Sequence, residues 1–199
     1  MIVTLADICN VSSGFTARSR LDDVMSGAPV LQTRDIGDDP RIYASGLMRT
    51  TIDSSVERYL VGCGDVVFKS KGERSVAAYL GDDFVVPAVA VLPVMILRVS
   101  AKVLPEFLVW SINQPEAQRH FDGDARSGTI RVVPKASIES LPISLPDLAT
   151  QKKIVEVDRL TRKEAELSGQ LISLRQRLVT EKLKALTKGA VARGMQEGF

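Results

Sequence analysis

Residues 141–154 read Leu141-Pro142-Ile143-Ser144-Leu145-Pro146-Asp147-Leu148-Ala149-Thr150-Gln151-Lys152-Lys153-Ile154, a proline-punctuated apolar run that leads directly into a charged segment. Before this point, residues 1–146 carry short β-prone runs separated by Gly, Pro and Asp, which is typical of a strand-and-loop domain. After it, residues 147–188 contain no proline and a single glycine, which indicates a long helix. The stretch therefore separates two parts of the chain.

A long helix is expected from residue 147 to residue 188. Asp147 directly follows Pro146 and is a favoured residue at a helix N-cap, and Gly189 is expected to end the helix. At a rise of about 1.5 Å per residue, such a helix is a rod of roughly 60 Å. Because this exceeds the size of the preceding domain, we expect a long projecting C-terminal coiled-coil helix, followed by a tail at residues 189–199.

An apolar stripe runs along the expected helix. Its members follow alternating steps of three and four residues, interrupted at Glu164. They are Val157, Leu160, Leu167, Leu171, Leu174 and Leu178. The stripe resumes one position over at Val179, Leu183 and Leu186, so the pattern predicts a coiled-coil seam with a stutter. The alternative is an ordinary amphipathic helix packed on its own domain.

Residues 1–146 are expected to form an α+β domain with a small, curved, mixed or antiparallel sheet and short helices. β-branched and aromatic runs bounded by Gly, Pro and Asp predict the strands. These strands are expected at residues 28–33, 59–70, 76–80, 84–86 and 90–99. Gly62-x-Gly64 is interpreted as a hairpin turn. Short helices are expected at residues 105–113, beginning with Pro105, and at residues 116–121.

Charge is distributed unevenly along the chain. The formal net charge is +2, but residues 1–150 hold 15 Lys and Arg against 18 Asp and Glu, whereas residues 151–188 hold 10 against 5. A basic helix can follow phosphates, and a merely solvated charged face is the alternative. No apolar run approaches the roughly 20 residues that span a bilayer, and the first residues lack the features of a signal peptide. We therefore expect a cytoplasmic protein without a membrane partner.

Several short elements occur in the order typical of one family. They are Leu5-Ala6-Asp7-Ile8 followed by Ser13-Gly14-Phe15-Thr16, then Thr33-Arg34-Asp35-Ile36, then Gly64-Asp65-Val66-Val67, and finally Leu145-Pro146-x-Leu148-x-x-Gln151-x-x-Ile154. With these elements the chain resembles a half-length specificity (S) subunit of type I restriction–modification systems, meaning one target recognition domain plus one conserved helix. Asp147 and Thr150 stand where the family usually has proline and glutamate, and both still suit a helix start.

The resemblance implies a domain that reads DNA with its loops. Arginine would pair with guanine and lysine would neutralise phosphates, while other polar side chains contact phosphates and base edges. The candidates on loops and strand ends are Thr16, Arg18, Arg20, Gln32, Arg34, Lys69, Lys71, Arg74, Arg126, Ser127, Thr129 and Arg131. Because the domain has a net negative charge, its basic residues must gather on one face to bind DNA.

The resemblance also implies partners. In the family, two recognition domains are joined by two antiparallel conserved helices, which set the distance between half-sites and dock methyltransferase subunits. This chain has one copy of each, which implies a homodimer that reads an interrupted palindrome of double-stranded DNA. A restriction or translocase subunit is a further possible partner. The candidate dimer interface is Val157, Leu160, Leu167, Leu171, Leu174 and Leu178.

No catalytic residue, cofactor or metal site is expected in this chain. A methyltransferase motif such as Asn-Pro-Pro-Tyr is missing, and no lysine follows an acidic residue by two positions, as a restriction-type nuclease needs. His120 is interpreted as structural, and Cys9 and Cys63 as buried free thiols. Two other classes stay open, namely a coiled-coil adaptor or regulatory half-subunit that does not read DNA, and a metal-dependent hydrolase.

Overall fold

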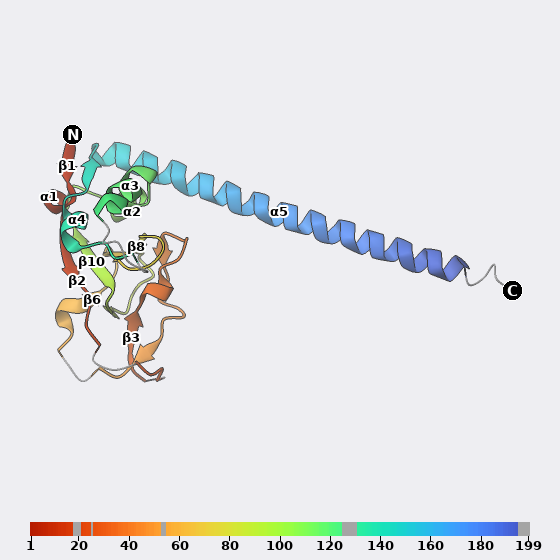
Figure 1. Ribbon diagram of the computed structural model, residues 1–199, viewed down its shortest axis with the longest axis horizontal. Coiled ribbons are helices and arrows are strands. Elements are labelled where there is room, and N and C mark those ends of the chain that lie inside the picture. Colours follow the sequence, from red (N-terminus) through yellow and green to blue (C-terminus); the bar gives the residue numbers. More distant parts are fainter. Residues whose placement is uncertain (18–20, 25, 53–54, 125–130, 195–199) are drawn as a thin grey trace. The chain divides into compact units, whose positions relative to one another are not determined.

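The computed structural model describes residues 1–17, 21–24, 26–52, 55–124 and 131–194, with side chains described up to residue 186 in the last helix (Figure 1). The chain divides into two compact units, Met1–Val155 and Glu156–Phe199. The first unit contains every strand of the described chain and the four shorter α-helices. The second is a part of the long helix α5 (Leu148–Gly194).

A five-stranded sheet lies at the centre of the first unit. Within the described residues its order is β2 (Cys9–Ser13), β10 (Val94–Val99), β7 (Val66–Lys69), β8 (Ala77–Leu80) and β4 (Arg41–Ile42). Only the β4–β8 pair is parallel among these neighbours. The sheet confirms the expectation of a mixed sheet built from short β-branched runs.

Two smaller sheets complete the strands of the described chain. One has the order β5 (Arg49–Thr50), β3 (Ala28–Leu31), β9 (Ala88–Ala90) and β6 (Leu60–Val61), with β3 and β9 parallel. The other pairs β1 (Ile2–Thr4) with β11 (Pro142–Ser144). The proline-punctuated run before α5 thus contains a strand that pairs with the start of the chain.

The helices pack on one face of the five-stranded sheet. They are α1 (Leu5–Ile8), α2 (Pro105–Ile112), α3 (Pro115–Asp124) and α4 (Lys135–Glu139). Two 3-10 turns, Thr33–Asp35 and Glu57–Tyr59, lie elsewhere in the unit. The expected helices near residues 105–113 and 116–121 are confirmed as α2 and α3. Pro105 and Pro115 each occupy the first helical position, where a missing N–H leaves no hydrogen bond unmade.

Both faces of the central sheet are buried: one face packs against the helices and the other against the four-stranded sheet, and alternate side chains of a strand point to opposite faces. Phe68 of β7 packs with α2 and α3, and its ring lies 5.2 Å from that of Phe121. The neighbouring Val67 belongs to a second cluster that joins the central sheet to the four-stranded sheet. Burial of each large apolar side chain stabilises the unit by about 1.5–3 kcal/mol.

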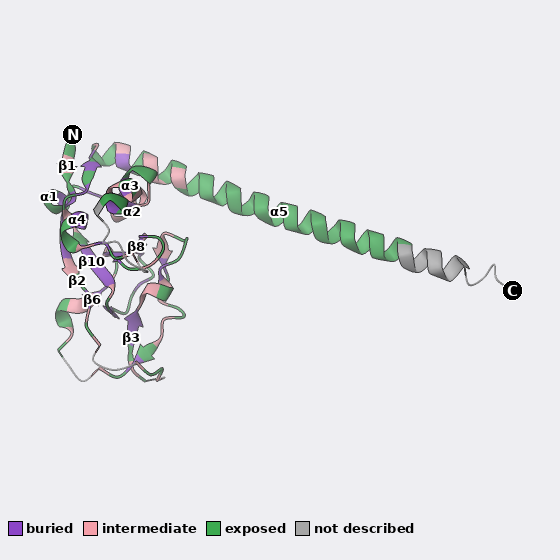
Figure 2. Ribbon diagram, viewed as in Figure 1, coloured by how far each residue is buried: buried purple, intermediate pink, exposed green. Residues whose placement is uncertain are grey.

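Helix α5 begins as the sequence predicts. Asp147 caps it, since the Thr150 amide donates to Asp147 Oδ1 over 2.8 Å. Beyond the first turns the described side chains are mostly exposed, as Figure 2 shows in green. The helix continues past Gly189 to Gly194, so the expected stop at Gly189 is wrong. A single glycine weakens a helix by about 1 kcal/mol relative to alanine and does not by itself end it.

Three local expectations are wrong. Residues 84–86 form a loop instead of a strand, because Phe84 closes a turn onto Gly81 and Pro87 has no N–H for a ladder. The Gly62-x-Gly64 turn, with Gly64 at φ +85°, connects β6 and β7 of different sheets and is not a hairpin. Cys9 is buried and its pKa is raised to about 12 by that burial, but Cys63 is exposed.

Candidate nucleic-acid interface

The segment after β2 lies against the turn between β9 and β10. The Gly14 amide donates to the Val94 carbonyl over 2.9 Å, and the Phe15 amide donates to the Ala90 carbonyl over 2.7 Å. A Cβ at Gly14 would lie 2.7 Å from the Val94 oxygen, closer than any side chain tolerates. Glycine at this position therefore allows Thr16 and its neighbours to lie at the end of the sheet.

The loop between β7 and β8 reaches the same end of the sheet. Ser70 Oγ donates to the Pro93 carbonyl over 2.6 Å, which ties this loop to the β9–β10 turn. The Gly72 amide donates to the Arg131 carbonyl over 3.1 Å, and the Val133 amide donates to the Ser70 carbonyl over 2.8 Å. These bonds place residues 131–133, which precede α4, beside the β7–β8 loop with its basic residues.

Residues after β3 complete this group. The Val91 amide donates to the Leu31 carbonyl over 2.9 Å, so Gln32 and Arg34 follow directly beside the β9–β10 turn. A hollow of about 540 Å³ opens here. Its lining includes Ala17, Leu21, Gln32, Arg34, Met48 and Leu92. We call residues 14–17, 32–36, 69–74, 91–93 and 131–133 together the loop edge.

The described candidates differ in exposure. Thr16, Arg34, Lys71 and Arg74 are exposed, whereas Gln32 and Lys69 are half-buried. Arg74 pairs with Asp38 at 3.3 Å, but 75% of its side chain remains accessible, so the pair is weak and exchangeable. The loop edge thus presents exposed cationic side chains from two separate segments, residues 32–36 and 69–74.

Arg131 differs from the other basic candidates. Only 19% of its side chain is exposed, and Nη1 lies 2.6 Å from Asp122 Oδ1 on α3. Its Nε and Nη2 atoms are buried and have no hydrogen-bond partner within the described part of the chain. The carbonyl of Arg131 holds the Gly72 backbone, and its side chain packs against Asp122 and does not extend into solvent.

Five candidates, Arg18, Arg20, Arg126, Ser127 and Thr129, lie outside the described residues. Acidic groups also occur at the loop edge. Asp35 accepts the Gln32 N–H over 2.7 Å, yet burial raises the pKa of its carboxyl. Glu73 of the loop edge is exposed, and Asp38, the partner of Arg74, is exposed as well. The field at this edge therefore depends on both accessible basic and accessible acidic side chains, with Asp35 partly withdrawn from solvent.

Two polar residues that the sequence analysis did not single out hold the base of the β7–β8 loop. Asn113 forms a reciprocal pair with the Ala77 backbone, with both hydrogen bonds at 2.9 Å. Gln118 Nε2 donates to the Ser75 carbonyl over 2.9 Å. An Asn between two predicted helices looks like any cap in the sequence, so no local signal distinguishes it.

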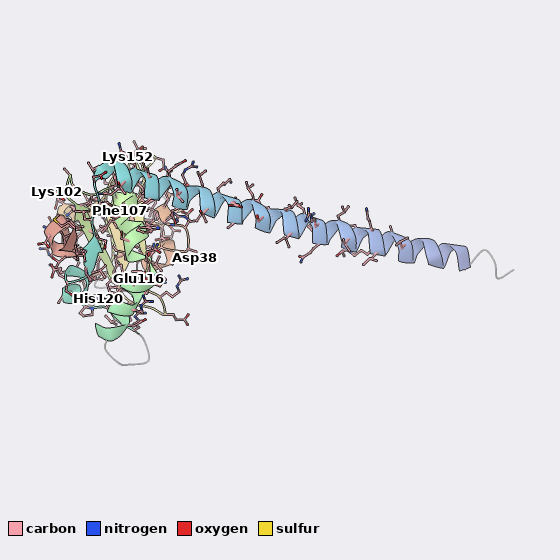
Figure 3. All side chains as sticks on the ribbon, turned by 90° about the horizontal axis from the view of Figure 1, so that it is seen from above. Asp38, Lys102, Phe107, Glu116, His120 and Lys152 are labelled. Atoms are coloured by element: carbon pink, nitrogen blue, oxygen red, sulfur yellow. The ribbon has the colours of Figure 1, made fainter. Side chains whose placement is uncertain are left out.

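The described residues contain no group of three or more His, Cys, Asp or Glu that could hold a metal ion. His120 Nε2 lies 2.9 Å from the Ser137 carbonyl oxygen and 3.3 Å from Ser140 Oγ, so its ring joins α3 to α4; His120 is labelled in Figure 3. No described helix combines the length and apolar character needed to cross a membrane.

The sequence of the chain matches the model of one protein family. Residues 1–173 match the model of the type I restriction modification DNA specificity domain. The chain belongs to this family. The match covers the whole first unit and the first part of α5, and it confirms the resemblance carried by the motifs from Leu5 to Ile154. No curated protein matches the chain in sequence.

Solved structures of specificity subunits share the fold of this specificity domain. The HsdS subunit of Thermoanaerobacter tengcongensis superposes with a TM-score of 0.60 at 18% identity, covering 84% of this chain and 38% of that one. The type I restriction-modification S subunit of M. genitalium gives a TM-score of 0.50 at 11% identity, covering 89% and 42%. This chain therefore spans less than half the length of the specificity subunits that it matches.

Proposed function

We propose that this chain is a non-catalytic DNA-reading subunit of a type I restriction–modification complex. The observation that carries the proposal is the loop edge, where backbone hydrogen bonds bring separate polar and basic segments to one end of the sheet. Arg34 is suited to a base edge because its fork of donors matches guanine, and Lys71 is suited to a phosphate. The expected cytoplasmic location belongs to the same proposal.

A homodimer is the second part of the proposal. The six seam residues of α5, from Val157 to Leu178, are between 49% and 63% exposed, and large apolar side chains at coiled-coil spacing favour a second helix as their partner. A second copy supplies the same stripe and the second recognition domain. A two-fold dimer would read two inverted half-sites separated by a spacer and would present paired docking surfaces to methyltransferase subunits.

The alternative is a coiled-coil adaptor that binds protein partners without reading DNA. The exposed apolar stripe of α5 and the net negative charge of residues 1–150 favour it. Both proposals require the helix to associate, so the oligomeric state alone cannot separate them. DNA affinity in variants that keep the dimer separates them.

The test compares two triple alanine variants with equal charge loss. One removes Arg34, Lys71 and Arg74 from the loop edge, and the other removes Lys102, Lys152 and Lys153, which are exposed near the start of α5. We expect the first to lose at least about a hundredfold in affinity for a selected duplex, and the second less than about tenfold. Equal losses, or no loss in either, with the dimer retained would favour the adaptor.

A further inference from the structure

Gln151 is the buried residue of α5. Among the α5 side chains that the structure describes, it alone is fully buried, with 0% exposure, while its neighbours Lys152 and Lys153 are exposed. A buried amide is unfavourable unless its polar atoms are bonded, because they lose their bonds to water. A polar side chain buried at this position must therefore form hydrogen bonds of defined direction, which an apolar side chain cannot form.

The amide of Gln151 is fully bonded. Its Oε1 accepts the Leu104 N–H over 2.9 Å. Its Nε2 donates to the Lys102 carbonyl over 3.0 Å and to the Pro146 carbonyl over 2.9 Å. Leu104 is the N-cap of α2, so one side chain joins the first turn of α5 to the start of α2 and to the residue before the α5 cap.

Apart from the Asp147 cap on Thr150, the remaining contacts described for this part of α5 with the core are apolar. Ile154 and Val155 are partly buried against the main core cluster, and Val155 is the last residue of the first unit. Apolar contacts resist separation but allow rotation and sliding, since they have no preferred direction. The three hydrogen bonds of Gln151 instead fix distance and angle.

Small errors at the start of a long helix become large at its far end. A tilt of about 10° displaces a point about 45 Å along the helix by about 8 Å, more than two base-pair steps of about 3.4 Å. The α5 helix is continuous from Leu148 to Gly194. The residue that fixes its first turn therefore determines how sharply a dimer can select the spacing of two half-sites.

We propose that Gln151 is a positioning residue that fixes the first turns of α5 on the recognition unit and so restricts the spacer length that the dimer accepts. This inference rests on the proposed DNA-reading dimer. It makes Gln151 a determinant of spacing specificity without contact to DNA. Lys102, whose carbonyl accepts one of its bonds, and Lys152 are labelled near the start of α5 in Figure 3.

The test uses Gln151→Met, which keeps the length and helix propensity of the side chain and removes all three hydrogen bonds. Lys152→Met is the matched control at an exposed neighbour. Affinity is measured for a duplex with one half-site and for a series with two half-sites whose spacer varies one base pair at a time. Gln151→Asn, whose shorter amide cannot reach all three partners, is measured in parallel as the milder change.

We expect wild type and Lys152→Met to share one sharp spacer optimum. Both Gln151 variants should bind the single half-site within about threefold of wild type, while their preference for the best spacer over its neighbours falls on the order of tenfold. An unchanged spacer profile in a Gln151 variant that binds the single half-site overturns the inference alone. Loss of single half-site binding by both variants also overturns it, because Gln151 would then support the domain itself. A wild type without a spacer optimum overturns the inference together with the dimeric reader.

Discussion

At the scale of the residue, the loop edge combines accessible and internal cations. Arg34 and Lys71 are exposed on separate segments, whereas Arg131 is largely buried and paired with Asp122. Accessible cations can release counterions from DNA, but a buried one mainly supports the backbone around it. The same residue type therefore has different expected effects at positions that are indistinguishable in the sequence.

Exposed cations should separate into two classes of DNA contact. Lys71→Ala is expected to weaken binding about equally for all sequences and to lower the slope of log K against log salt by about one, as loss of one phosphate contact does. Arg34→Ala is expected to relax the preference at one base pair by about 1–3 kcal/mol. Binding titrations over a range of salt with a target and its single-base variants measure both. An Arg34→Ala profile that is uniformly weaker at every position would contradict the assignment.

Arg131 should matter for stability first. Replacing Arg131 by Met removes its ion pair with Asp122, and we expect the free energy of unfolding to fall by about 1.5–3 kcal/mol. Lys71→Met, in the adjacent exposed loop, should leave stability within about 0.5 kcal/mol of wild type. Urea denaturation of the two variants provides the comparison. Equal stability would show that the Arg131 side chain is not required by the fold.

At the scale of the element, α5 has a defined start and an exposed length. Asp147 accepts hydrogen bonds from the amide and hydroxyl of Thr150. The backbone bond, followed by the hydroxyl bond, lowers the pKa of the Asp147 carboxyl. Its contribution to stability is therefore complete above the ordinary aspartate pKa and is lost as pH falls through the lowered value.

The cap predicts a pH-dependent helix start. Asp147→Asn keeps a good N-cap that does not titrate, so its difference from wild type should favour wild type at pH 7 and be smaller near pH 3, below the ordinary aspartate pKa. Asp147→Ala should lower the melting temperature by a few degrees at pH 7. Thermal unfolding followed by circular dichroism at both pH values checks this. A constant difference between wild type and Asp147→Asn across the range would argue against the cap.

The seam predicts the oligomeric state. Lysines at Leu171 and Leu174 would place four charges in a dimer interface, and we expect the dimer to dissociate at micromolar concentration. Ser173→Lys lies on the opposite side of the helix and is the matched control, which should remain dimeric. Sedimentation equilibrium measures the change. If the Ser173→Lys variant dissociates, or if the variant with lysine at both 171 and 174 stays dimeric, the dimer interface does not run along this seam.

Helices with a regular apolar spacing and a capping residue were predictable from the sequence, whereas strands and loops fixed by contacts distant in the chain were not. The N-cap of α5 and the proline start of α2 follow from local chemistry. The loop at residues 84–86 has the composition of a strand, but Val85 is 85% exposed and has no ladder to join. β11 was missed because its partner, β1, lies at the start of the chain.

At the scale of the whole molecule, a fold shared with specificity subunits supports a reader with one recognition domain and one long helix. The sequence predicted which loops carry the candidate residues, because glycine and basic residues mark them. It could not predict that these loops meet, since the bonds from Gly14 to Val94 and from Gly72 to Arg131 join segments far apart in the chain. Nor could it show that Gln151 is buried.

The most direct test of the central claim is selection from a randomised duplex pool at physiological salt, with and without the methyltransferase subunit encoded by the same source, followed by sequencing of the retained DNA. A dimeric reader should enrich two inverted half-sites separated by a spacer of fixed length. Retained DNA with no enriched sequence under either condition would contradict it and would leave the coiled-coil adaptor as the better description.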